Sequence, residues 1–146
     1  DVYKRQEIIE ARRILQVSCL QQAVVNADDA QLRNIETALR RQQDPEISDE
    51  DFCQADVAFH RALVDATNNG MLRFVMYTVI EALIPVTNMV VTVVRERSDI
   101  VSLHQQMLAQ LHQRNAAELG KLMNELLDYL LQKFEQATAV RAQESI

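Results

Sequence analysis

The chain has 146 residues, of which 48% are hydrophobic, and it contains only two glycines, two prolines and two cysteines. This composition is rich in helix formers and poor in turn formers, so it predicts one all-α domain long enough to bury a core. The formal net charge is −6 and the basic residues form no cluster. That charge pattern argues against direct nucleic-acid contact by this segment, because phosphate binding needs Lys and Arg gathered on one surface.

The first helical pattern runs from the start of the chain to about Val25. The opening hexapeptide Asp-Val-Tyr-Lys-Arg-Gln resembles the translation of a transposon end used in sequencing libraries, so we expect residues 1–6 to be a non-native leader. Arg12 falls on the inward face of this helix, and a buried guanidinium must find an anion. That anion is either structural, such as Asp56 or Glu81, or the carboxylate of an effector held in bidentate fashion.

Two further helices are expected before residue 70. Asn26 predicts the N-cap of the second helix, which should end before Asp44-Pro45. Ser48 predicts the start of the third helix through a capping-box pattern, and Asn68-Asn69-Gly70 predicts its end.

The third helix carries the most informative motif, Ala-Asp-Val-Ala-Phe-His at residues 55–60. Asp56 and His60 are four residues apart, so both side chains lie on one helix face and can meet one ligand. Both residues flank an apolar stripe and should therefore point partly inward. The stripe consists of Phe52, Ala55, Phe59, Ala62, Leu63 and Ala66.

Residues 71–95 predict a fourth helix that bends at Pro85, although the Val and Thr of residues 86–94 favour a strand locally. The segment is apolar over roughly the length of a membrane span. Arg73 and Glu81 interrupt it, and charges near a bilayer centre are costly. We therefore expect a central helix buried by its neighbours, and no membrane partner.

Two more helices complete the pattern. Ser98-Asp99 opens the fifth helix, where His104 stands in an inward apolar stripe, and Asn115 caps the sixth. The end of the chain should fray, with residues 143–146 as a frayed tail. The economical architecture is a single antiparallel bundle of about six helices.

Asp56, His60 and His104 are three polar groups expected inside one core. Buried polar groups are costly unless partnered, so these residues need one another, a metal, water or a ligand. The simpler alternatives are a core histidine bonded to a carbonyl or carboxylate for His104, and a self-satisfied pair for the other two. Arg95, before the fifth helix, is either a contact for the far end of an effector or a plain surface charge.

Four landmarks together resemble a known family. They are Glu10-Ala11-Arg12, Asp56-Val-Ala-Phe-His60, Asn69 and His104. The sequence resembles the FCD-type effector-binding C-terminal domain of GntR-family transcription regulators of the FadR subfamily, over residues 7–142. The resemblance implies an all-helical bundle that forms a homodimer and senses a small organic acid. With Arg95, which is named from its place before the fifth helix, Arg12 and Asn69 are the candidate effector contacts.

Members of that family often bind a divalent metal through one aspartate and three histidines. The resemblance places the first three ligands at Asp56, His60 and His104, and the third histidine falls at Leu126. Leu126 cannot ligate, so two alternatives stand: a three-ligand site completed by water or an effector carboxylate, or a branch without metal. Carboxylate and imidazole ligands suit Zn, Ni or Mn.

The favoured function is an effector-sensing and dimerisation domain that relays carboxylate binding to an N-terminal winged helix-turn-helix, which would make the DNA contacts. Cys19 and Cys53 lack metal-type spacing and indicate reduced core residues of a cytoplasmic protein. The alternatives are a metal-dependent hydrolase, because an open metal position can activate water, and a helical adaptor without a ligand. No nucleophile motif or separate general base supports an enzyme.

Overall fold

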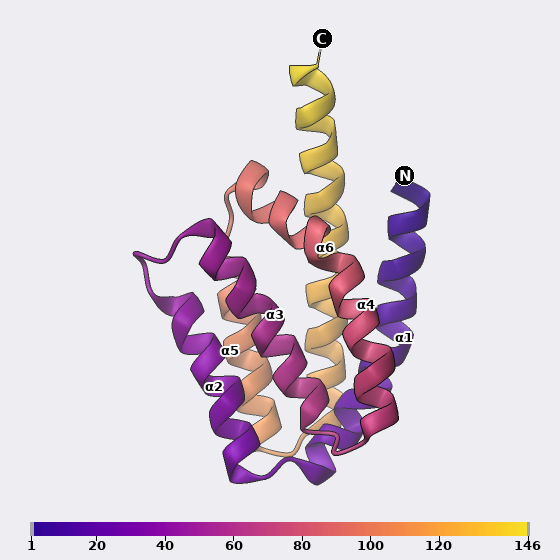
Figure 1. Ribbon diagram of the computed structural model, residues 1–146, viewed down its shortest axis with the longest axis vertical. Coiled ribbons are helices and arrows are strands. Elements are labelled where there is room, and N and C mark those ends of the chain that lie inside the picture. The colour runs from indigo at the N-terminus through magenta and orange to yellow at the C-terminus, as the bar shows by residue number, and fades with distance from the viewer. Residues whose placement is uncertain (1, 146) are drawn as a thin grey trace.

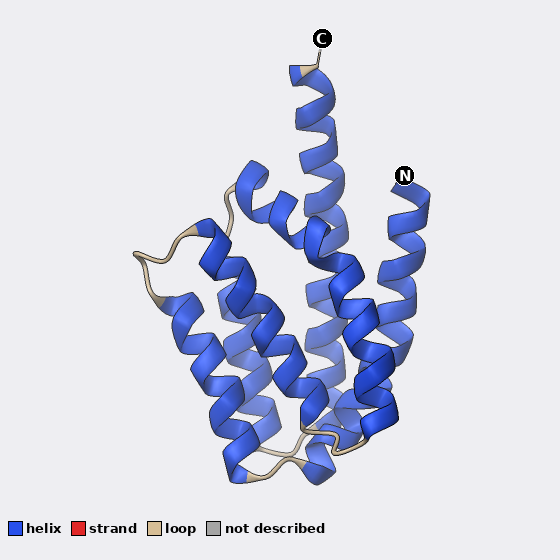
Figure 2. Cartoon of the chain, in the orientation of Figure 1, coloured by secondary structure: helices blue, strands red, loops and turns tan. Residues whose placement is uncertain are grey.

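The computed structural model describes residues 2–145 and confirms the all-α prediction, with six α-helices, one π-helical segment and no strand in that range. Residues 1 and 146, at the ends of the expected leader and tail, lie outside the described residues. In chain order the elements are α1 (Val2–Asn26), α2 (Asp29–Gln43), α3 (Asp49–Asp65), α4 (Gly70–Met89), η1 (Val90–Val94), α5 (Ser98–His112) and α6 (Ala116–Glu144). Short loops at the two ends of the bundle connect them (Figure 2).

The helices form one bundle in which α2, α3 and α5 lie on one side and α1, α4 and α6 on the other (Figure 1). Helix α2 packs against α3 and α5, α3 against α4, and α1 against α4 and α6. All six α-helices contribute buried side chains to the main core, among them Ile9, Leu32, Phe59, Leu83, Met107 and Leu126. The start of α1 and the end of α6 extend past the bundle at the same end.

The helix caps confirm two predictions and correct one. The side chains of Ser48 and Asn115 accept backbone hydrogen bonds at the starts of α3 and α6, as predicted. The N-cap of α2 is Asp28 rather than Asn26: its carboxylate accepts from Gln31 N at 2.8 Å, and Gln31 Oε1 accepts from Asp28 N at 3.0 Å. This reciprocal capping box satisfies two orphan donors at once, which the Asn26 start does not.

The fourth helix ends earlier than residue 95. Pro85 lies inside α4, and the β-branched run that follows forms the π-helical segment η1 instead of continuing the α-helix. Arg95 then closes the segment in a left-handed conformation, with φ at 60°. Branched side chains are stiff and crowd the preceding helical turn, and at this run the chain widens into a π-helical turn rather than forming a strand.

The last helix, α6, reaches Glu144. That residues 143–146 form a frayed tail stays a prediction. Ala137 is the last buried residue of α6, so the final turns extend beyond the packed core. Residues 138–144 are mostly Ala, Gln, Arg and Glu, and these good helix formers favour the helical conformation where the helix leaves the core.

Residues Gly70–Val94 are long and apolar enough to cross a membrane by length and composition, and 39% of the most apolar window is buried. One face of α4 packs into the protein through Met76, Ile80 and Leu83. The opposite face stays apolar at Phe74, which is 73% exposed. The segment therefore combines a core-facing side with an exposed apolar side.

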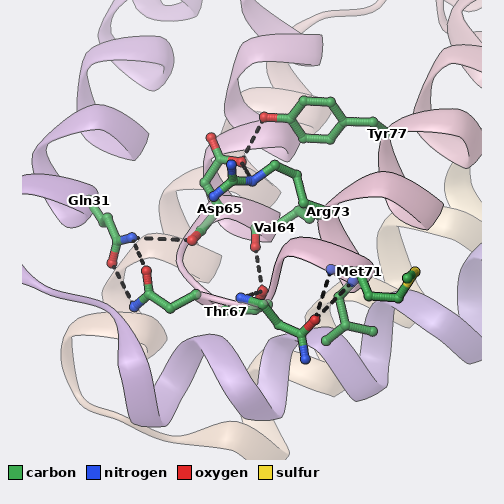
Figure 3. A network of polar contacts seen from close by, with 10 residues as sticks. Gln31, Val64, Asp65, Thr67, Met71, Arg73 and Tyr77 are labelled. Carbon is green, nitrogen blue, oxygen red and sulfur yellow. Dashed lines mark hydrogen bonds and ion pairs between the residues drawn. The ribbon is translucent and has the colours of Figure 1, made fainter.

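The turn between α3 and α4 is fixed by polar contacts centred on Asp65 (Figure 3). The Tyr77 hydroxyl donates to Asp65 Oδ1 at 2.6 Å, and Arg73 Nε lies 3.2 Å from the same oxygen. From α2, Gln31 Nε2 donates to the Asp65 carbonyl at 3.2 Å. These contacts join three helices at one end of the bundle and hold α3, which carries the polar motif, against α2 and α4.

Candidate metal and effector site

Helices α3 and α5 bring Asp56, His60 and His104 together in the core. His60 Nε2 lies 3.6 Å and His104 Nε2 lies 3.5 Å from the same carboxylate oxygen, Asp56 Oδ1. All three residues are buried, and one ligand atom from each lies within 4.8 Å of the others. The four-residue spacing on α3 and the inward stripe on α5 therefore converge as the sequence led us to expect.

Aromatic packing fixes the two imidazole rings. Phe59 stacks on His104 with ring centroids 4.0 Å apart and an interplanar angle of 13°. The His60 ring meets the His104 ring edge-on, with centroids 5.0 Å apart. These contacts leave the rings little freedom to turn, so the Nε2 atoms are held toward the carboxylate.

A residue that the sequence interpretation missed completes the environment of His104. Gln42, near the end of α2, places Oε1 2.7 Å from His104 Nδ1, and both side chains are buried. A signal for it existed, because Gln42 follows Ile35 and Leu39 at helical spacing on the inward face of α2.

The electrostatics of the cluster favour one anion and two neutral imidazoles. Burial alone raises the pKa of Asp56, but His60, His104 and Arg12 oppose it and hold that pKa at about 2. Burial lowers the pKa of His104 to about 3, and the charges of His60 and Arg12 act in the same direction. Burial, with the charge of Arg12, also lowers the pKa of His60. At neutral pH both imidazoles keep a lone pair.

Arg12 lies in the core on α1, as predicted, with only 2% of the residue exposed. Its Nε donates to Gln16 Oε1 at 3.0 Å, one helical turn further on, while Nη2 is buried without a hydrogen-bond partner. Glu81 is exposed and does not pair with it. Asp56 attracts the guanidinium electrostatically, but no hydrogen bond joins the two side chains. One donor atom of this guanidinium, Nη2, is therefore not satisfied by a hydrogen bond within the protein.

The other two expected effector residues do not join the cluster. Asn69 is exposed and caps α4, where its Oδ1 accepts from the backbone N–H groups of Met71 and Leu72. Arg95 is exposed at the end of η1. Leu126, at the position of the family's third histidine, is only 1% exposed and belongs to the apolar core. The protein itself therefore offers three converging ligands.

A surface pocket of about 800 Å³ lies on the neighbouring face of α3, between that helix and the α4–η1 segment. Its walls include Cys53, Val57 and Arg61 from α3, and Asn88 and Thr92 opposite. Asp56 and His60 are not among its lining residues, so this pocket is separate from the buried cluster.

The fold is an all-helical bundle with a buried cluster of potential metal ligands at its centre. A family model described as FCD domain matches residues 7–129, and the chain belongs to the FCD domain family. Membership classes it as an effector-binding regulatory domain. The fold is similar to the crystal structure of a transcriptional regulator, a GntR family member from Pseudomonas syringae pv. tomato str. DC3000, with a TM-score of 0.80 at 14% identity. The match covers 99% of this chain and 61% of that chain. No curated protein matches the chain.

The donor set fits a divalent ion on three grounds. An ionised carboxylate with neutral imidazoles is the ligand chemistry of zinc and similar ions. The buried Nε2 of His104 has no hydrogen-bond partner. Metal ligands about 2.1 Å from a tetrahedral ion lie about 3.4 Å from one another; the two separations from Asp56 Oδ1 are 3.5 and 3.6 Å, and the three ligand atoms all lie within 4.8 Å of one another. Asp56, His60 and His104 would hold the ion and leave one position open.

Proposed function

We propose that this domain senses a small organic acid inside the bundle and relays its binding to an N-terminal winged helix-turn-helix of a cytoplasmic transcription regulator. The observation that carries the proposal is the buried Arg12 guanidinium, whose Nη2 has no partner, beside the Asp56–His60–His104 cluster. A buried cation of this kind is costly unless an anion completes it. An effector carboxylate supplies that anion.

The chemistry of the site selects a carboxylate. Arg12 presents a planar fork of donors that matches two carboxylate oxygens, and Gln16 orients that fork from the following turn of α1. A divalent ion on Asp56, His60 and His104, when bound, supplies a positive charge and an open position for a carboxylate oxygen or water. Leu126 supplies no fourth protein ligand, so an effector oxygen or water would complete the coordination.

The positions of these residues on three helices suggest how effector binding would be transmitted. Arg12 lies on α1, Asp56 and His60 on α3, and His104 on α5. An effector that contacts all of them links three helices, and it shifts their arrangement only if it binds one arrangement more tightly than the other. Helix α1 would transmit the change, because it is the first helix of the domain and so would connect to the proposed N-terminal DNA-binding domain.

We further propose that the domain forms a homodimer through the exposed apolar face of α4. Met71, Phe74 and Val75 are 71%, 73% and 37% exposed there, and their i, i+3 and i+4 spacing puts them on one face of α4. Large apolar side chains gathered on one face mark an interaction surface. Light scattering should give a dimer that Phe74→Glu converts to a monomer; a monomeric wild-type protein would exclude this part of the proposal.

A hydrolase is the weaker alternative. Among residues 2–145, Asp56, His60 and His104 form the one group of potential metal ligands, and all three are used as ligands, so no further carboxylate or imidazole remains there as a general base. The helical adaptor is the other alternative, and it requires that Arg12 only stabilise the fold and bind no ligand.

The test is a thermal-shift screen of mono- and dicarboxylates with and without Zn²⁺, followed by calorimetry on any acid that stabilises the protein. Arg12→Met should lose the response. Arg13→Met is the matched control, because Arg13 is the next residue on α1 and its contacts are with α6 instead: it pairs with Asp128 at 2.5 Å and donates to Asn124 Oδ1 at 3.2 Å. Equal responses from wild type and Arg12→Met would remove the effector from this site.

A further inference from the structure

In the described part of the chain, Gln42 is the one residue of α2 that forms a hydrogen bond with the buried cluster. Its Oε1 lies 2.7 Å from His104 Nδ1. A carbonyl oxygen can only accept, so Nδ1 carries the hydrogen in this contact. The neutral ring then keeps its lone pair on Nε2, the atom that lies 3.5 Å from Asp56 Oδ1. Gln42 thus selects the tautomer in which His104 can ligate toward Asp56.

The amide nitrogen of Gln42 makes no hydrogen bond that would stabilise the fold. This nitrogen, Nε2, is buried and has no hydrogen-bond partner. Leaving an amide donor unpaired in a core costs about 1–3 kcal/mol, which an apolar side chain of similar size avoids. Ile35 and Leu39, on the same face of α2, are apolar and buried. A glutamine at this place therefore lowers stability, and its one productive contact is with His104.

We infer that Gln42 is a positioning residue of the metal centre, which holds the His104 imidazole in its metal-binding tautomer and orientation. The inference rests on the proposed function, because it assumes that Asp56, His60 and His104 bind an ion. A hydrogen-bond acceptor behind a ligating imidazole fixes the ring and raises its basicity, and its loss typically weakens metal affinity about 10–100-fold.

The experiment compares wild type with Gln42→Met, which removes the acceptor at similar volume, and Gln42→Glu, which keeps an accepting oxygen. Gln43→Met is the matched control, since Gln43 is the adjacent residue and is exposed. Zn²⁺ affinity is measured by competition with a chromophoric chelator. The His104 tautomer is read in the metal-free protein from ¹⁵N NMR shifts, and stability from urea unfolding.

We expect Gln42→Met to bind Zn²⁺ about 10–100-fold more weakly, to lose the Nδ1–H tautomer of His104, and to be at least as stable as wild type without metal. Gln42→Glu should keep the tautomer and restore the affinity, and Gln43→Met should match wild type. Wild-type affinity in Gln42→Met, or an unchanged tautomer, would overturn the inference.

The two proposals fail separately. If wild-type protein binds no Zn²⁺, the metal centre is wrong, and so is the metal-positioning role of Gln42. If wild type binds Zn²⁺ through the cluster but Gln42→Met binds it equally well, only the role of Gln42 is wrong. Should Gln42→Met fail to fold, Gln42→Glu still decides the matter: loss of the Nδ1–H tautomer there would overturn the inference, and its retention with wild-type affinity would support it.

Discussion

Replacing Arg12 by Met should make the effector-free protein more stable while abolishing its response to carboxylates. Burial lowers the pKa of Arg12 to about 10, even though Asp56 attracts it. Relative to an ordinary arginine pKa of about 12.5, and at about 1.4 kcal/mol per pKa unit, the folded state pays roughly 3 kcal/mol to hold this charge at neutral pH. The charge destabilises the folded state because Arg12 binds its proton more tightly in the unfolded chain than in the folded protein.

Two smaller effects oppose the gain. Gln16 Oε1 loses its partner in Arg12→Met, and a buried unpaired acceptor costs about 1 kcal/mol or more. Methionine has a similar length and fits the apolar surroundings, so the cavity left behind is small. The net expectation is a metal-free protein that is about 1–2 kcal/mol more stable than wild type.

Urea unfolding in the presence of a chelator and without effector measures this difference. Arg13→Met serves as the control; it removes a half-buried guanidinium that pairs with Asp128 and hydrogen-bonds to Asn124 on α6, so it should lower stability by about 1–2 kcal/mol rather than raise it. A loss of more than about 1 kcal/mol in Arg12→Met, without any effector present, would refute the reasoning. Arg12 would then be a structural tie, and the adaptor interpretation would be favoured over the sensor.

Three further predictions follow from the same geometry. Leu126→His should tighten Zn²⁺ binding in a chelator competition assay, and an unchanged affinity would mean that the side chain at position 126 does not face the cluster. Metal-free protein should lose stability as pH falls below about 6.5. Folding lowers the pKa values of His60 and His104, so below that pH the unfolded chain binds more protons than the folded protein. Urea unfolding between pH 7.5 and 5 would show this loss, and a stability that does not change with pH would contradict it. Cys53 should resist iodoacetamide at pH 7.5, since burial and then Asp56 raise its thiol pKa to about 11; rapid labelling of the native protein in a mass-spectrometric time course would disagree.

Local patterns were enough to predict much of the fold and the centre of the site. The i, i+4 spacing of Asp56 and His60 and the inward stripe around His104 specify helix faces, and helix faces determine what meets in a bundle core. The caps at Ser48 and Asn115 are equally local. The second helix start was misplaced by two residues because both Asn26 and Asp28 are good caps, and only the reciprocal contact with Gln31 decides between them.

Long-range packing decided the rest. The contact between Gln42 and His104 spans 62 residues, and no pattern within α2 shows which side chain it meets. Asn69 is a strong helix cap in its own right, and this local role accounts for its position without an effector. The π-helical end of the fourth helix, which leaves Arg95 exposed, depends on how a β-branched run packs rather than on its composition.

The most direct test of the buried site is X-ray absorption spectroscopy at the zinc edge on protein loaded with one equivalent of Zn²⁺. The ligand shell should contain two imidazoles and no sulfur in wild type, and one imidazole in His104→Ala. Sulfur scattering from a cysteine, or a shell without imidazole, would contradict a metal centre formed by Asp56, His60 and His104.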